Sequence, residues 1–179
     1  DAWSKMQVPQ GFTSYIYNWG YYLPTGFTPQ RYPEHSAEQV RTFVKFGIKG
    51  VYRCAFGDNM GLEGPNYYVF GKLWDDPEQD PQVLAEEFYQ AAFGPAAPMM
   101  RKFYQTLFER LRSFTLLQNQ RGYGAKSAIP DNPRILLGYI YSPDLLDSME
   151  KSLSRAEKLA DNDKIRKRLE LVRLEFDYA

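Results

Sequence analysis

The sequence predicts an α/β segment followed by an all-helical region, so that the chain as a whole is mostly helical. In the first 64 residues, strand, loop, helix and strand signals follow one another, and from Pro65 onward apolar residues recur every three or four positions. A chain of 179 residues is long enough for one domain or for one and a half. We therefore divide it into residues 1–64 and residues 65–179.

The first part contains the pattern of a parallel strand pair. Residues 12–19 (FTSYIYNW) predict a strand, which is followed by a loop rich in Pro and Gly. Ser36 is a good N-cap for a helix over residues 37–46, and residues 48–57 (IKGVYRCAFG) predict a second strand. This order is typical of a right-handed crossover unit in a parallel sheet. Because two strands alone are not stable, we expect partner strands from upstream sequence or another chain.

The second part predicts a series of helices with one apolar face each. The expected helices cover residues 67–74, Pro81 to a break at Gly94-Pro95, residues 96–120, a helix from Pro143, and a helix capped by Asp163. Residues 134–141 (RILLGYIY) are ambiguous between strand and helix, and we favour helix. The apolar stripe of residues 96–120 predicts packing rather than ligand binding.

Charge and motif content exclude several classes of function. The 22 basic and 22 acidic residues cancel, so we expect no nucleic-acid partner. No apolar run reaches the roughly 20 residues of a membrane span. The single Cys54 and single His35 cannot supply a thiolate or imidazole metal site, and we expect His35 to have a surface role. No phosphate loop, dinucleotide fingerprint or serine nucleophile elbow is present, so we expect neither metal nor cofactor.

The loop after the second predicted strand contains the best candidates for chemistry. Asp58 and Glu63 lie in a Gly-rich turn between Arg53 on the strand and Asn66 at the next helix start. Strand-to-helix loops are where α/β barrels place active sites, and glycosyl transfer uses paired carboxylates. Asp58 and Glu63 are therefore the candidate catalytic carboxylates, with Arg53 and Asn66 as substrate contacts. The alternative is that these acidic residues only satisfy free amides at a helix start.

The end of the first predicted strand is the second candidate region. Tyr17, Asn18 and Trp19 lie there, in a chain that is 16 % aromatic. An indole or phenol ring stacks well on a sugar ring, and Asn18 offers hydrogen bonds to hydroxyl groups. These three residues are therefore candidate sugar contacts. The alternative is aromatic packing under the long loop.

One segment of the sequence resembles a known family. The run GLEGPNYYVFGKLWDDPEQDPQVLAEEFYQAAFGPAAPMMRKFYQTLFERL resembles the C-terminal part of the bacterial proteins called domain of unknown function 4838. It is more distantly similar to the α-glucuronidases of glycoside hydrolase family 67. The resemblance covers residues 12–178, and its most specific parts are the glycine–glutamate loop, the KLWDDP turn and FYQAAFGPAA.

The resemblance implies the last strands of a TIM-like (β/α)8 barrel, ending near residue 65, with a C-terminal helical domain beside it. In such families the catalytic carboxylates come from several strand ends, and most of those would lie upstream of Asp1. It also implies a carbohydrate substrate and a secreted or periplasmic parent protein. Because the chain lacks an initiator Met and its last helical pattern still runs at Phe176, we expect a fragment that is inactive alone.

Two hypotheses of function follow. In the first, the parent protein hydrolyses a glycosidic bond in a polysaccharide or glycan, and this chain supplies one wall of the cleft. In the second, the chain is a non-catalytic accessory or assembly module that docks on the rest of the parent chain or on a second subunit. A homo-oligomer through the helical domain stays open. The first hypothesis predicts that Glu63, Arg53 and Trp19 converge on one pocket.

Overall fold

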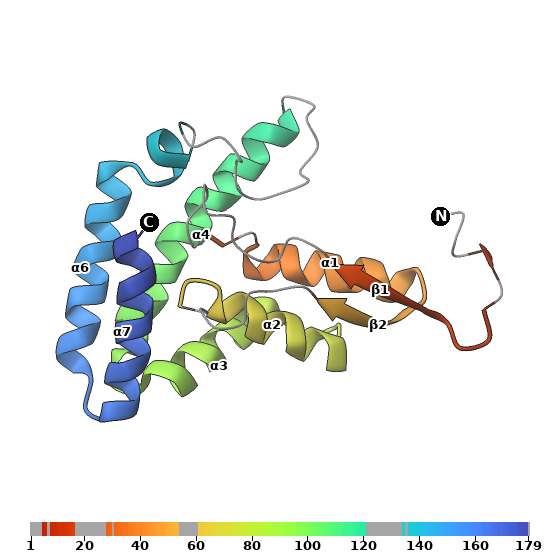
Figure 1. The fold of residues 1–179 in the computed structure, drawn as a ribbon, viewed down its shortest axis with the longest axis horizontal. Coiled ribbons are helices and arrows are strands. Elements are labelled where there is room, and N and C mark those ends of the chain that lie inside the picture. Colours follow the sequence, from red (N-terminus) through yellow and green to blue (C-terminus); the bar gives the residue numbers. More distant parts are fainter. Residues whose placement is uncertain are drawn as a thin grey trace.

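A computed structural model describes residues 5–6, 8–16, 28–29, 31–53, 61–120, 134 and 136–178, without the side chains of Arg53 and residues 116–120. The strands are β1 (Phe12–Ile16) and β2 (Ile48–Arg53). The helical elements are α1 (Pro33–Lys45), α2 (Gly64–Asp75), α3 (Pro81–Phe93), the 3-10 turn η3 (Gly94–Ala96), α4 (Ala97–Gln120), the π-helical turn η4 (Leu136–Ile140), α6 (Pro143–Leu159) and α7 (Asp163–Tyr178). The mostly helical character is therefore confirmed (Figure 1).

The predicted strand–helix–strand unit is confirmed. β1 and β2 pair in parallel, with α1 between them in the sequence. Ile16 is buried on the face of the sheet that meets the core, whereas Tyr15 and Tyr52 are register partners that stack at 5.4 Å and are 55 % and 71 % exposed. Parallel sheets are normally covered on both faces. Within the described residues, this sheet has two strands and its tyrosine face is uncovered.

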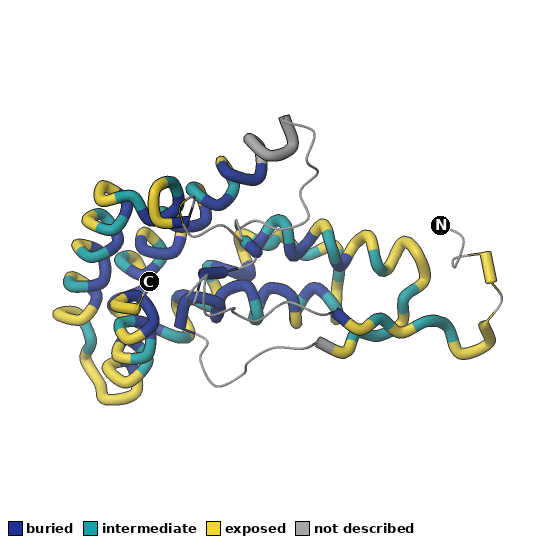
Figure 2. Tube along the Cα trace, turned by 45° about the horizontal axis from the view of Figure 1, so that its top comes forward, coloured by how far each residue is buried: buried dark blue, intermediate teal, exposed yellow. Residues whose placement is uncertain are grey.

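The helices share one hydrophobic core. α2 packs between α1 and α3, while α4 and α6 form the most extensive helix pair and α7 packs on α3 and α6 (Figures 1 and 2). The predicted stripe on α4 is buried, with all of its members at most 4 % exposed: Met100, Phe103, Leu107, Leu111 and Phe114. Burying each such side chain contributes roughly 1.5–3 kcal/mol. This stripe is therefore the centre of the core.

The core also crosses the boundary that we predict at residue 64. One cluster of buried residues extends from Ile16 on β1 to Phe176 on α7, and α1 packs directly on α2 and α3. The strand pair and the helices are therefore in direct contact, and the division into two domains stays a prediction. Among the helices of the described part, none combines the length and hydrophobicity needed to cross a bilayer.

The predicted starts of α1 and α2 are three or four residues late, because α2 begins at Gly64 rather than at residue 67, and the predicted cap of α7 is wrong by one residue. α1 begins at Pro33 with Tyr32 as its N-cap residue, and Ser36 is a buried residue inside the helix. Proline at the first helical position is pre-organised for a helix and needs no amide partner, which explains the earlier start. Asp163, which we predict to be the cap of the last helix, is instead the first residue of α7, and the cap is Asn162, whose Oδ1 accepts a hydrogen bond from Ile165 N at 3.0 Å.

Three other local predictions are confirmed. Asp80 caps α3, because its Oδ1 accepts from Gln82 N at 2.7 Å. Gly94 breaks the helix with φ +49°, a value that L side chains rarely adopt. The ambiguous stretch before Ser142 is helical, as a π-turn.

Candidate functional site

The candidate site is built around the turn of residues 61–63, which leads into α2. Leu62 and Glu63 are 0 % and 1 % exposed, and Glu63 is the residue that precedes the first residue of α2. In the sequence the turn follows the carboxyl end of β2. The turn therefore occupies a strand-to-helix connection, as predicted.

Two side chains from the helical region hold this turn. The Glu175 carboxylate on α7 accepts hydrogen bonds from Gly61 N and Leu62 N, both at 2.6 Å. Tyr104 on α4 donates its hydroxyl to the carbonyl oxygen of Gly61. We call this set, Glu175 and Tyr104 with the main chain of Gly61 and Leu62, the Glu175 clamp. It fixes backbone groups that would otherwise be buried without partners.

The clamp explains why residue 61 is glycine. A Cβ at this position would lie 2.8 Å from Glu175 Cδ and 2.9 Å from the carbonyl oxygen of Leu171. A larger residue would therefore push α7 away from the turn. Burial raises the pKa of Glu175, and the two amide hydrogen bonds only partly oppose this effect.

Glu63 belongs to a buried polar centre that also contains Arg31 and Asn66. Burial lowers the pKa of the Arg31 guanidinium, and the negative charge of Glu63 raises it again. Asn66, in the first turn of α2, donates its Nδ2 hydrogen to the carbonyl oxygen of Arg31 at 2.6 Å. Arg31 and Asn66 are 9 % and 0 % exposed. The Glu63 turn, the chain before α1 and the start of α2 therefore meet in one place.

The polar centre extends to the chain that follows η4. Tyr141 is buried, and its hydroxyl hydrogen-bonds Thr28 Oγ1 at 2.8 Å. Burial raises the pKa of Tyr141, and the charge of Glu63 adds to the increase. Residues far apart in sequence, Arg31 and Tyr141, thus lie close enough to Glu63 for its charge to shift their pKa values.

The expectation of a surface role for His35 is wrong. The ring is only partly exposed and lies 5.6 Å from the ring of Tyr32. Burial, together with the positive charge of Arg31, lowers the pKa of His35 to about 4. His35 is therefore a neutral neighbour of the polar centre near pH 7.

Only part of the predicted site lies in the described residues. Glu63 and Asn66 are brought to one buried centre, whereas Arg53 is described only as the last main-chain residue of β2. The remaining candidates lie outside the described residues: Tyr17, Asn18, Trp19 and Asp58. Convergence of Glu63, Arg53 and Trp19 on one pocket stays a prediction.

The sequence reasoning missed Arg31, Tyr141 and Glu175. Glu175 had a detectable signal, because it lies three residues after Val172 and so shares the inward face of α7. A carboxylate at an inward position indicates a buried partner. Arg31 had none, since it lies in an aperiodic Pro- and Gly-rich stretch. Among the described side chains, no group of three or more His, Cys, Asp or Glu is placed to hold a metal ion.

The family comparison agrees with the resemblance of the sequence. A family model described as "Domain of unknown function (DUF4838)" matches residues 1–105, which is more than half of the chain. This chain belongs to the DUF4838 family. The matched part of the DUF4838 chain includes the strand pair, the Glu63 turn and the first part of α4. No curated protein and no solved structure matches the chain.

Proposed function

We propose that this DUF4838 chain is part of a glycoside-hydrolase-like protein that acts on a polysaccharide or glycan, and that the Glu63 turn contributes to its sugar-binding cleft. The observation that supports the proposal is the buried carboxylate of Glu63 in a strand-to-helix connection, where the preceding main chain at Gly61 and Leu62 is held by two helices through the Glu175 clamp. Rigid positioning from outside the loop is what a catalytic or binding group requires.

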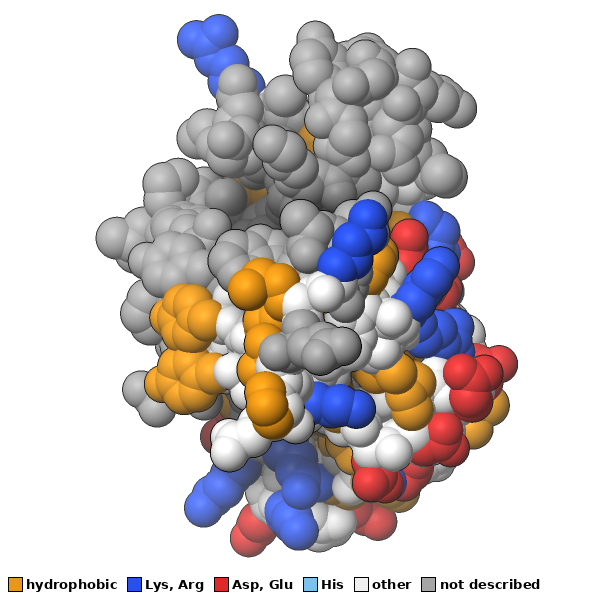
Figure 3. Space-filling model, turned by 90° about the vertical axis from the view of Figure 1, so that its right-hand side faces the viewer, with side chains coloured by type: hydrophobic (Ala, Val, Ile, Leu, Met, Phe, Trp, Pro, Cys, Tyr) orange, Lys and Arg blue, Asp and Glu red, His pale blue; other side chains and the backbone are white. Residues whose placement is uncertain are grey.

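The proposal includes a sheet that continues beyond β1 and β2, as the last strands of a TIM-like barrel. The helix-covered face of the strand pair would be the outer face of that barrel, and the face of Tyr15 and Tyr52 would be its interior. Figure 3 shows hydrophobic side chains gathered at the end of the molecule where the strands lie. Further parallel strands would cover this face and satisfy the outer main-chain edges of the pair.

The chemistry follows from the carboxylate. In glycoside hydrolysis, one carboxyl group protonates the leaving oxygen while the other activates water or attacks the sugar. In this proposal Glu63 is one of the pair, Arg31 and Asn66 keep its surroundings polar, and the second carboxylate comes from Asp58 or from upstream sequence. Because Glu63 is 1 % exposed, its carboxylate has to become accessible when substrate binds.

A second candidate function is a non-catalytic accessory or assembly module. The burial of Glu63, beside Arg31, favours it, as does the internal hydrogen bond of Asn66. In that case the polar centre only joins the strand pair to the helices, and the uncovered face of the strand pair docks on the rest of the parent protein or on a second subunit.

Turnover of oligosaccharides by the full-length protein separates the two candidates. We expect Glu63→Gln to lower hydrolysis by a factor of about 10² or more while binding persists, and Trp19→Ala to weaken binding. Glu170→Gln, at an exposed position on α7, is the matched control and should change neither. Unchanged turnover and binding in both site variants would favour the accessory module.

A further inference from the structure

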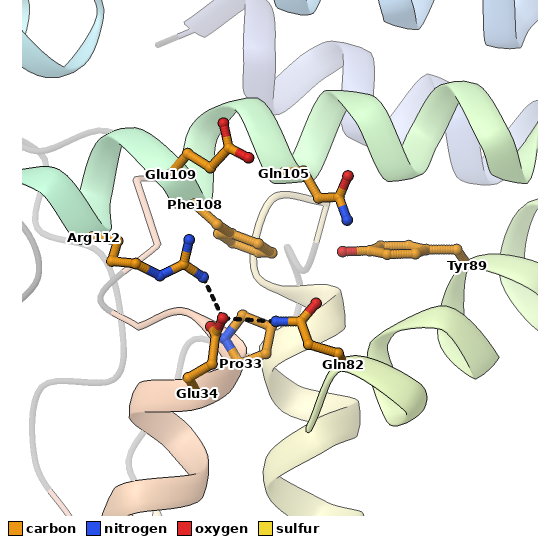
Figure 4. Close-up of a pocket in the computed structure, with 8 residues that line it drawn as sticks. All are labelled: Pro33, Glu34, Gln82, Tyr89, Gln105, Phe108, Glu109 and Arg112. Atoms are coloured by element: carbon orange, nitrogen blue, oxygen red, sulfur yellow. Dashed lines mark hydrogen bonds and ion pairs between the residues drawn. The ribbon is translucent and has the colours of Figure 1, made fainter. Parts of the chain in front are cut away.

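A separate cavity lies on the helical part of the molecule. It has a volume of about 220 Å³ and is formed by the first turn of α1, by Gln82 and Tyr89 of α3 and by one face of α4 (Figure 4). Its polar lining groups come from six residues: Glu34, Gln82, Tyr89, Gln105, Glu109 and Arg112. None of them belongs to the Glu175 clamp or to the polar centre around Glu63.

One corner of the cavity is already neutralised. Arg112 forms an ion pair with Glu34, and Gln82 Nε2 donates to Glu34 Oε1 at 2.7 Å. The Arg112 guanidinium also lies over the ring of Tyr32, at 5.2 Å from its centroid. Because the charges of Arg112 and Glu34 neutralise each other, Glu109 is the remaining charged residue among those that line the cavity. The cavity therefore disfavours anions.

Tyr89 presents a fixed hydroxyl to the cavity. Its ring is 3 % exposed and stacks on Tyr104 at 5.6 Å, so it cannot turn away. Figure 4 shows its hydroxyl pointing into the cavity, near Gln105. Burial raises its pKa well above 10, which keeps the hydroxyl protonated. Because the hydroxyl faces the cavity, a ligand hydroxyl can take the place of water as its hydrogen-bond partner.

The other polar groups that line the cavity also form hydrogen bonds with hydroxyl groups. The amides of Gln82 and Gln105 both donate and accept, Glu109 accepts, and the ring of Phe108 adds an apolar wall (Figure 4). Hydroxyl groups pair with all of these, whereas a purely apolar ligand pairs with none. The volume is below the roughly 300 Å³ at which pockets for drug-sized molecules begin, so it suits one ring.

We propose that this cavity binds a single neutral sugar ring or a polyol of similar size. One ligand hydroxyl forms a hydrogen bond with the Tyr89 hydroxyl, and other ligand hydroxyls form hydrogen bonds with Gln105 and Glu109. It is a second carbohydrate site, apart from the Glu63 turn, and it does not depend on catalysis. We expect it to prefer neutral sugars over uronates modestly, because Glu109, an exposed carboxylate, lines the cavity.

Ligand-observed saturation-transfer NMR on the full-length protein tests the site. The probes are glucose, xylose, glucuronate and methylamine, each titrated to about 20 mM. We expect stronger saturation transfer from the neutral sugars than from glucuronate. Tyr89→Phe keeps the stacked ring and removes only the hydroxyl, so it should raise Kd by about fivefold. Tyr68→Phe, whose hydroxyl lies outside the cavity, should stay within about twofold of wild type.

The outcomes separate this site from the proposed function. Glu63→Gln should leave neutral-sugar binding at this cavity unchanged. Binding that depends on Glu63 and not on Tyr89 would overturn the second site and leave the cleft proposal standing. Binding of methylamine alone, or no binding of any sugar at 20 mM, would overturn the assignment of a sugar ligand.

Discussion

Removing the Glu175 carboxylate should release the Glu63 turn from the helical region. In Glu175→Ala the amides of Gly61 and Leu62 lose the carboxylate oxygens that accept from them at 2.6 Å, and Glu175 itself is only 2 % exposed. Hydrogen bonds to a charged group contribute about 1.5–3 kcal/mol each, but the desolvated carboxylate is itself costly, so we expect a net loss of about 3 kcal/mol. Glu175→Gln keeps one acceptor and should lose about 1–2 kcal/mol.

Equilibrium urea unfolding measures these losses, and amide hydrogen exchange locates them. We expect the Gly61 and Leu62 amides to exchange faster in Glu175→Ala, while amides in the middle of α6 change less. Gly61→Ala should also destabilise the fold, by about 1–3 kcal/mol, because its Cβ would lie 2.8 Å from Glu175 Cδ. The part of this clash that involves Glu175 disappears in the Glu175→Ala background, whereas the contact with the Leu171 carbonyl oxygen at 2.9 Å stays, so the double variant should lose less than the sum of the single variants.

Glu170→Gln is the control, because Glu170 is an exposed carboxylate on the same helix. It should change the free energy of unfolding by less than about 0.5 kcal/mol. A Glu175→Ala variant that unfolds within 0.5 kcal/mol of wild type, with unchanged exchange at Gly61 and Leu62, would refute the clamp. Additive effects in the double variant would refute the close contact between Gly61 and Glu175.

Three further predictions concern stability. The pKa of His35 is about 4 in the folded protein, below the ordinary 6.5, so between these pH values the unfolded chain binds more protons than the folded one. The free energy of unfolding should therefore fall as the pH drops from 6.5 to 4. Because His35 is partly exposed, we expect His35→Gln to remove about 1–2 kcal/mol of this pH dependence, measured by urea unfolding at several pH values. Arg173 on α7 bonds Glu150 at 2.5 Å and Glu157 at 2.9 Å on α6, so Arg173→Met should lower the free energy of unfolding by about 1–2 kcal/mol, less in high salt. Asp80→Ala removes the cap of α3 and should cost about 1 kcal/mol in thermal melts.

Local sequence signals predicted most of the fold. The apolar stripe of α4 and the Asp80-Pro81 and Gly94-Pro95 pairs indicated elements that the structure contains, because spacing, caps and backbone restrictions act within a few residues. The start of α1 was missed because two local signals competed, and Pro33 at the first helical position prevailed over Ser36 as a cap.

The candidate site was less predictable, because its contacts join distant residues. The Gly-rich turn after a predicted strand made Glu63 a candidate carboxylate, but nothing near it indicated that α7 would supply Glu175. Arg31 likewise reaches the polar centre only through the packing of the chain before α1 on α2. Long-range pairs of this kind follow from tertiary packing, which a single sequence does not encode as a local pattern.

Chemical rescue is the most direct test of the central proposal that Glu63 is a working carboxylate. Turnover of the best oligosaccharide would be measured for full-length Glu63→Ala with and without added formate or azide, with circular dichroism as a check on folding. The account predicts a folded variant whose turnover falls by a factor of about 10²–10⁴ and is partly restored by the small anion. Wild-type turnover in Glu63→Ala, or a loss that tracks unfolding and is not rescued, would contradict it and identify Glu63 as a structural residue.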